Sequence, residues 1–173
     1  TLQRCRRTIA DWLTLHDEHR LAFMPNTTTA CSLTLSRIPW RTGDILLTTT
    51  HENSTILQEI NELEDRGIEI ICLDPDAPSG LLPQLNQMVQ RQTVRAIIVS
   101  HVSHLDGRIF PIADIQELAQ AHQALLIVDG AQAVRTRRRR PRRADLLAGC
   151  VGAVHAGHRQ EGALHIREFA GFD

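Results

Sequence analysis

The chain has 173 residues, a formal net charge of -1 and 42% hydrophobic residues, which suits one domain with a buried core. No apolar run approaches the roughly 20 residues of a membrane-spanning helix, and no apolar signal segment opens the sequence. Four widely spaced cysteines without a CxxC pair predict reduced thiols, no metal site and a cytoplasmic location. The sequence contains no lysine, so all 19 basic residues are arginine.

Positive charge is concentrated in one short segment, RTRRRRPRR at 135–143, which holds seven arginines and no acid. The remaining 12 arginines face 20 acidic residues, so the rest of the chain is acidic. An arginine run suits a nucleic acid or another acidic partner. No aromatic residue is interleaved with the run, however, and a solvated tail is the alternative.

Helical and strand patterns alternate along the first part of the chain. Apolar spacing predicts a helix over 8–19, and a short apolar run at 21–24 is interpreted as a strand that Pro25 ends. The next helix is expected over 27–38, stopped by Pro39, and a strand follows at 45–49. Further elements are expected as a helix over 54–66, a strand over 68–73, a helix over 82–89, a strand over 96–100, a helix from 111 and a strand over 124–129.

Strands separated by single helices predict right-handed crossovers and a parallel sheet with helices on both faces. The strands IIVS and LLIVD are almost continuously apolar, which fits burial on both sides. The fold class is therefore α/β. The alternation stops at Val134, so residues 1–134 are interpreted as one partial domain and 135–173 as a separate, arginine-rich tail.

Polar residues follow the predicted strands at their carboxyl ends, which is where parallel α/β sheets bind ligands. Thr27 and Thr28 open a helix, where hydroxyls and free N–H groups suit a phosphate; a plain helix cap is the alternative. Asp129 would pair with a protonated ring nitrogen or a metal, or simply begin a loop. His51 would stack on an aromatic ligand or serve as a structural histidine.

Two further positions complete this candidate site. His104 lies three residues after His101 in a loop, a weak metal pair because no third ligand is evident. Gln132 lies three residues after Asp129. A phosphate loop, a ring stacker, an acid for a ring nitrogen and a polar partner three residues on are together what a pyridoxal phosphate site requires.

Four stretches in register resemble the class V aminotransferase family of pyridoxal-phosphate enzymes, which includes cysteine desulfurases and isopenicillin N epimerase-like proteins. The resemblance runs from about residue 8 to 134 and rests on FMPNTTTACSLTL, GDILLTTTHENSTIL, VRAIIVSHVSHLDGRIFPIADI and ALLIVDGAQAV. It implies part of the large domain of fold type I and the cofactor pyridoxal 5'-phosphate. For intact relatives it implies an amino-acid substrate, a homodimer, and transamination, desulfuration or epimerisation.

The resemblance also implies roles for single residues. Thr27 and Thr28 would take the cofactor phosphate, Asp129 would pair with the pyridine nitrogen, and Gln132 would hydrogen-bond the ring hydroxyl. Many relatives have Glu-His-Asn-Ser where this chain has His-Glu-Asn-Ser at 51–54. Within these four, the resemblance favours His51 as the stacking residue. Many relatives also carry Asn where this chain has His104, so the contact with the ring hydroxyl is altered here.

The largest departure from the family is the missing lysine. Relatives form a Schiff base through a lysine in a Gly-His-Lys or Ser-His-Lys segment, and the nearest match here is GHR, which places Arg159 at the lysine's position. A guanidinium, with a pKa above about 12, stays protonated and is no amine nucleophile. We therefore expect no catalytic residue of that kind, and whether this chain is an enzyme stays open.

Three hypotheses follow. In the first, the chain is a truncated or frameshifted piece of a pyridoxal-phosphate enzyme and inactive as written, with the arginine run marking a frameshift near Val134. In the second, it is a degenerate homologue that binds the cofactor or a partner without catalysis. In the third, residues 135–143 bind nucleic acid or another acidic partner, which their composition makes the weakest reading.

Overall fold

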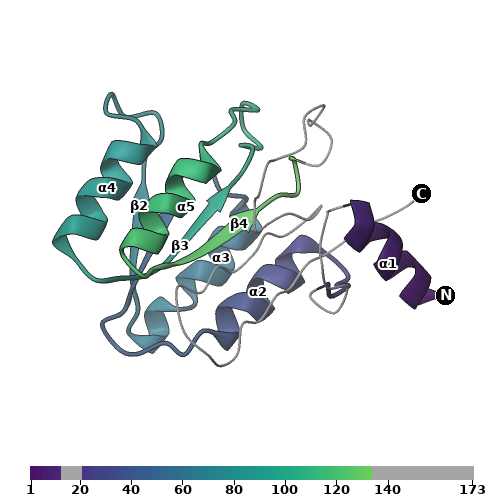
Figure 1. Cartoon of the computed structure of the whole chain (residues 1–173). Helices are drawn as coiled ribbons and strands as arrows, with labels where there is room; N and C mark the ends of the chain where they lie inside the picture. The colour runs from purple at the N-terminus through teal and green to yellow at the C-terminus, as the bar shows by residue number, and fades with distance from the viewer. Residues whose placement is uncertain (13–20, 134–173) are drawn as a thin grey trace.

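A computed structural model describes residues 1–12 and 21–133, and it contains one parallel four-stranded sheet with helices on both faces (Figure 1). The predicted α/β class is confirmed. Among the described residues the helices are α1 (Leu2–Trp12), α2 (Thr27–Arg37), α3 (Ser54–Asn61), α4 (Leu81–Arg91) and α5 (Ile112–Ala121), with a 3-10 turn η2 (Glu64–Arg66). The strands are β1 (Ile45–Thr49), β2 (Glu69–Leu73), β3 (Val94–Ser100) and β4 (Leu125–Asp129).

The strand order is β2-β1-β3-β4, so the chain changes direction across the sheet after β2. β1 pairs with β2 on one side and with β3 on the other. The chain therefore moves toward one edge of the sheet from β1 to β2, and toward the opposite edge from β2 to β3 and β4. In open parallel sheets, such a reversal opens a crevice beyond the carboxyl ends of the strands. This topology therefore predicts a ligand site beyond Thr49 and Ser100, where β1 and β3 end.

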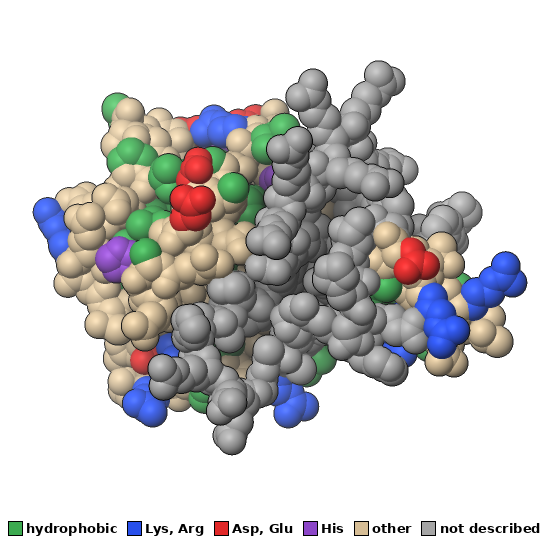
Figure 2. All heavy atoms as spheres, viewed as in Figure 1, with side chains coloured by type: hydrophobic (Ala, Val, Ile, Leu, Met, Phe, Trp, Pro, Cys, Tyr) green, Lys and Arg blue, Asp and Glu red, His purple; other side chains and the backbone are tan. Residues whose placement is uncertain are grey.

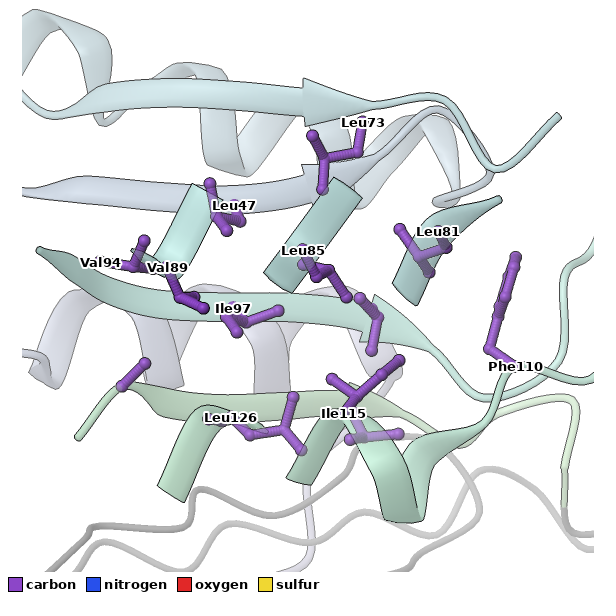
Figure 3. Close-up of a cluster of buried hydrophobic side chains, with 14 of the residues drawn as sticks. Leu47, Leu73, Leu81, Leu85, Val89, Val94, Ile97, Phe110, Ile115 and Leu126 are labelled. Atoms are coloured by element: carbon purple, nitrogen blue, oxygen red, sulfur yellow. The ribbon is translucent and has the colours of Figure 1, made fainter. Parts of the chain in front are cut away.

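Alternating side chains of the strands feed two hydrophobic clusters, one on each face of the sheet. Figure 3 shows the cluster under α4 and α5, where Leu47, Ile97 and Leu126 of three strands meet Leu85 and Ile115 of the two helices. The second cluster packs α2 and α3 against the opposite face, through Leu46, Ile98 and Ile127 among others. Both faces are buried because every crossover is helical, which explains the continuous apolar strands.

The helix predicted over 54–66 is divided into α3 and the 3-10 turn η2. Gly67 ends it with φ 77°, a left-handed conformation, and its N–H is bonded to the Glu64 carbonyl. Glycine suits this end of the helix, because it adopts this backbone conformation without steric cost.

Two expectations near the N-terminus differ from the structure. The segment 21–24 forms no strand, because none of the sheet pairings among the described residues includes it, although Leu21 is buried. The helix expected over 8–19 begins earlier, as α1, and residues 13–20 lie outside the described part. No helix within the described ranges is long and apolar enough to cross a membrane. On the visible face, basic side chains gather at the end of the molecule where α1 lies, and the other described charges are scattered (Figure 2).

Candidate functional site

A hollow of about 200 Å³ lies at the carboxyl end of the sheet, where the topology predicts a ligand. Ligand pockets of roughly 300–1,000 Å³ are usual, so this one suits a ligand of about one substituted ring. Its lining comes from the first turns of two helices, the ends of two strands and the loops that follow them. The lining residues are Thr27, Thr28, Asn53, Thr55, Ile56, Ser100, Val102, His104, Asp129, Ala131 and Gln132.

The first turn of α2 forms one end of the hollow. Asn26 caps this helix, and its Oδ1 accepts the Thr29 N–H at 2.8 Å and the Thr29 hydroxyl at 2.9 Å. The backbone N–H groups of Thr27 and Thr28 have no acceptor inside the helix, because the first N–H groups of any α-helix lack a carbonyl four residues earlier in the helix. Free amides, threonine hydroxyls and the positive end of the helix dipole together favour a phosphate at this end.

A second helix begins at the same place. Asn53 caps α3, and its Oδ1 accepts the Thr55 N–H at 3.0 Å and the Thr55 hydroxyl at 2.7 Å. The Thr55 and Thr28 hydroxyl oxygens lie 3.1 Å apart, so the two helix starts are bonded to each other. Both first turns thus present polar groups to one small volume.

Asp129 forms the opposite end of the hollow, at the end of β4. Its side chain is buried, and Oδ1 accepts the Ala131 N–H at 2.8 Å. Among the described residues, no donor bonds to Oδ2. Burial raises the pKa of Asp129 from 3.8 to about 6; the negative charge of Glu52 adds to the rise, and the Ala131 N–H opposes it. A carboxylate in this setting gains from a cationic partner, such as a protonated ring nitrogen.

His104 and Gln132 close the hollow from the loops after β3 and β4. The Nδ1 of His104 lies 3.2 Å from the backbone carbonyl of His51. A carbonyl only accepts hydrogen bonds, so this nitrogen carries a proton, which leaves Nε2 as the acceptor in the neutral ring. His104 can therefore offer either an acceptor or, when protonated, a second donor.

His51 takes a different place. Its ring is buried, with Nδ1 3.1 Å from the Ser103 hydroxyl and Nε2 3.1 Å from Asp76, and its edge faces the Phe110 ring. Arg108 holds the same Asp76 carboxylate at 2.6 Å, and these two partners, Arg108 first, lower the pKa of Asp76. His51 thus ties together the loops after β1, β2 and β3 and does not line the hollow, which Asn53 lines instead.

The structure therefore brings five of the six predicted cofactor residues to one hollow, namely Thr27, Thr28, His104, Asp129 and Gln132. The stacking role of His51 stays a prediction, and both of its ring nitrogens are engaged elsewhere. Sequence reasoning missed three polar lining residues, Asn53, Thr55 and Ser100, although each stands at a strand end or a helix start. Arg159, the run 135–143 and the tail 135–173 lie outside the described residues.

A larger, open groove of about 500 Å³ lies between the outer sides of α2 and α3. Glu59 is the only titratable residue among its described lining, and the other lining side chains are small polar groups and one leucine. It offers no buried charge to orient a ligand. No group of three or more histidine, cysteine or acidic side chains in the described ranges is placed to hold a metal ion.

A parallel α/β sheet whose carboxyl edge joins a helix start to a buried carboxylate is typical of cofactor-binding proteins. The family model for aminotransferase class-V matches residues 1–146, and the chain belongs to this family. The resemblance found in the sequence is thereby confirmed.

Curated relatives that the chain matches include two cysteine desulfurases. The cysteine desulfurase IscS of Pseudomonas fluorescens is 27% identical over 135 residues, which cover 76% of this chain and 33% of the relative. The probable cysteine desulfurase of Methanothermobacter thermautotrophicus is 23% identical over 133 residues, covering 77% and 33%. The chain thus spans about a third of the length of these relatives.

Solved structures give the same fold. A C-DES mutant with glycine covalently linked to its pyridoxal phosphate cofactor matches with a TM-score of 0.62 and 26% identity, over 74% of this chain and 35% of that one. The cysteine desulfurase of Thermococcus onnurineus matches with a TM-score of 0.65 and 22% identity, over 72% and 31%. The sheet is therefore part of the large domain of fold type I, as predicted.

Proposed function

We propose that this chain binds pyridoxal 5'-phosphate in the hollow between α2, α3 and the end of β4, and that it holds the cofactor non-covalently. One observation carries the proposal: the free first turn of α2 and the buried Asp129 carboxylate face the same volume of about 200 Å³. The cofactor has a phosphate and a ring nitrogen at separate positions of one ring, which matches this pair of ends.

The donor set of the hollow fits the cofactor. Thr27 and Thr28 offer hydroxyls and amides to a phosphate, without a described arginine at that end. No donor in the described part of the chain bonds to Oδ2 of Asp129, which leaves it to accept a ring N–H, and Gln132 and His104 line the same hollow as polar partners for a ring hydroxyl. Asn53 lines the hollow and His51 does not, so contact with the ring face would be weaker than an aromatic side chain would give.

When bound, the protonated cofactor ring supplies an electron sink for amino-acid chemistry. The residues of this chain would bind, orient and charge that ring. Asp129 would hold the ring proton, because a buried carboxylate stabilises an adjacent cation. The first turn of α2 would fix the phosphate, and His104 would set the position of the ring hydroxyl through the bond that anchors its Nδ1.

No residue of this chain supplies the amine for covalent attachment, because the sequence holds no lysine. The family resemblance places Arg159 at the position of the lysine, and a guanidinium is not a nucleophile at neutral pH. The proposal therefore treats the chain as part of a class V enzyme, or as a degenerate copy of one, without turnover of amino acids by itself.

The proposal extends to a cytoplasmic homodimer. The family resemblance supports the dimer, and the thiols of Cys5 and Cys72, which form no disulfide within the described residues, support a reducing compartment. Sedimentation velocity of the purified chain tests for the dimer. A monomer at all micromolar concentrations would contradict the proposed homodimer. The nucleic-acid alternative rests on 135–143 alone, and no described feature adds to it.

The test is a titration of the purified protein with pyridoxal phosphate, followed by absorbance, with and without borohydride. We expect saturable binding, release of the cofactor on denaturation after borohydride treatment, and loss of binding in Asp129→Ala. Cofactor that stays fixed to a side chain after reduction contradicts the non-covalent mode. Absence of saturable binding contradicts the proposed function itself.

A further inference from the structure

Glu52 is a buried acid, and within the described ranges no arginine forms an ion pair with it. The residue is 2% exposed, and it is not part of the lining of the hollow. Oε1 accepts the Thr49 hydroxyl at 2.6 Å and the Ser100 N–H at 3.0 Å, and Oε2 lies 2.6 Å from the Ser100 hydroxyl. Burying an unpaired acid is costly, so an amide or apolar residue would serve the fold better.

Ser100 links this acid to the hollow. It pairs with Asp129 in the register of β3 and β4, and residues that pair in register point to the same face of a sheet. Both side chains line the hollow, whereas Glu52 does not. The order from the protein interior to the ligand volume is therefore Glu52, then Ser100 beside Asp129.

The two carboxyl groups also interact through space. Burial is the main cause that raises the pKa of each, and the negative charge of Glu52 raises the pKa of Asp129 further. Among the described residues, the other titratable groups that interact with Glu52 are His104, which favours its charge, and the Cys72 thiol. The two acids share one region of low dielectric constant, so a cation bound in the hollow would lower the cost of ionising both carboxyl groups.

We propose that Glu52 is a positioning residue that acts through Ser100. It directs the hydrogen of the Ser100 hydroxyl away from the hollow and adds a second negative charge near Asp129. As a result, the hollow binds a ligand with a protonated ring nitrogen more tightly than a neutral ring of the same shape. This inference rests on the proposed function, since it concerns the ring end of the same site. It assigns the selection of charge to the pair of acids rather than to Asp129 alone.

The geometry sets the direction of the Ser100 hydrogen. An ionised Glu52 accepts that hydrogen, so the lone pairs of Ser100 are left for the hollow and attract a ring N–H. A protonated Glu52 donates to Ser100 instead, and the serine hydrogen is then free to turn into the hollow, where it opposes a cation. The charge of Glu52 therefore determines whether the Ser100 hydroxyl presents its lone pairs or its hydrogen to the hollow.

The variant Glu52→Gln tests this with little disturbance of the fold. The glutamine oxygen can accept from Thr49 and the Ser100 N–H, and the amide nitrogen can donate to the Ser100 hydroxyl. The variant thus copies the neutral acid. Two ligands are titrated into wild type and variant: pyridoxal phosphate and its analogue with CH in place of the ring nitrogen.

We expect wild type to prefer pyridoxal phosphate and Glu52→Gln to lose about tenfold of that preference, mainly through weaker binding of the nitrogen-containing ring. Cofactor labelled with ¹⁵N in the ring reports protonation directly by NMR. The bound ring nitrogen should lose its proton about one pH unit lower in the variant than in wild type. A purely structural role for Glu52 would move neither the preference nor the ¹⁵N titration.

Thr28→Val is the matched control, because it should weaken both ligands equally through the phosphate and leave the ¹⁵N titration unchanged. Should Glu52→Gln unfold, Ser100→Ala replaces it, since it removes the link but keeps the backbone donor to Glu52. Wild type that binds neither ligand overturns the proposed function. Wild type that binds pyridoxal phosphate, with an unchanged preference and ¹⁵N titration in the variants, overturns the role of Glu52 alone.

Discussion

The hydroxyl oxygens of Thr28 and Thr55 lie 3.1 Å apart and join the first turns of α2 and α3. Both helices pack on the same face of the sheet, through one hydrophobic cluster that includes Ala30, Ile56 and Ile60. The end of the hollow that we propose for the phosphate is therefore positioned by the packing of two helices on the sheet. Such a site is preformed before any ligand arrives, which reduces the entropy cost of binding.

Replacement of Thr28 by valine should weaken the binding of pyridoxal phosphate about tenfold, because it removes one hydroxyl contact to the phosphate and keeps the side-chain shape. The free energy of unfolding should change by less than about 1 kcal/mol. Titration calorimetry with pyridoxal phosphate and with inorganic phosphate as competitor measures the effect.

Thr29→Val is the control for this prediction. Thr29 lies in the same turn, but its hydroxyl is bonded to Asn26 and does not line the hollow. It should bind the cofactor as wild type does. Equal losses in the two variants would mean that the hydroxyls of this turn act only on the helix, not on the phosphate.

The stability of the cofactor-free protein should fall as the pH rises from about 4 to 6. The pKa of Asp129 is 3.8 in its ordinary state and about 6 in the fold, so the folded chain holds this proton more tightly than the unfolded chain. Ionisation at higher pH then costs about 3 kcal/mol. Glu52, whose pKa burial also raises, acts in the same direction.

Asp129→Asn isolates the contribution of Asp129, since an amide oxygen can still accept the Ala131 N–H. The variant should be more stable than wild type at pH 8 and less dependent on pH, as urea denaturation at pH 4 to 8 would measure. It should bind pyridoxal phosphate poorly, so stability and binding would change in opposite directions. Identical pH profiles for the two proteins would show that Asp129 is not desolvated in the free protein.

His51→Ala should lower the free energy of unfolding by about 2–4 kcal/mol, because it opens a cavity beside Phe110 and leaves the buried Ser103 hydroxyl without its ring partner. Chemical denaturation of the cofactor-free protein measures this. If His51 instead stacks on the cofactor ring, the substitution should leave stability nearly unchanged and reduce affinity for pyridoxal phosphate.

Asn53→His is a second test of whether the cofactor ring lies beside residue 53 or beside His51, because Asn53 lines the hollow. An imidazole there would give the cofactor ring a flat partner, so affinity should rise several-fold. The loss of the Asn53 cap on α3 should cost about 1 kcal/mol of stability. An affinity that falls together with stability would contradict a ring position beside residue 53.

The residues predicted from sequence and placed in the hollow share a local signature. Thr27 and Thr28 follow a cap-forming asparagine, and Asp129 ends an apolar strand, so their neighbours along the chain determine their place. Parallel strands then bring their carboxyl ends together without any further information. The fold class was predicted from the alternation of helical and strand patterns of apolar residues along the chain.

Glu52 and Ser100 could not be placed in this way. Their bond joins residues 48 positions apart, and it depends on β3 lying beside β1 rather than beside β2. The choice between His51 and Asn53 depends on a shift of two residues after β1, which the polar string THENS leaves open. The segment 21–24 had a strand-like composition, but composition does not supply a neighbouring strand.

Gly67→Ala should destabilise the protein more than Gly43→Ala does, although both glycines have a left-handed backbone, with φ of 77° and 87°. Alanine at Gly43 meets open space and pays only the backbone cost, about 1 kcal/mol. A methyl group at Gly67 would lie 2.8 Å from the Cγ2 atom of Thr42, so strain adds to that cost and the total should reach about 2–3 kcal/mol. Urea denaturation of both variants measures the difference. Thr42→Ser in the Gly67→Ala background removes the clashing methyl group and should restore the smaller value; equal costs in all three proteins would place the whole effect in the backbone.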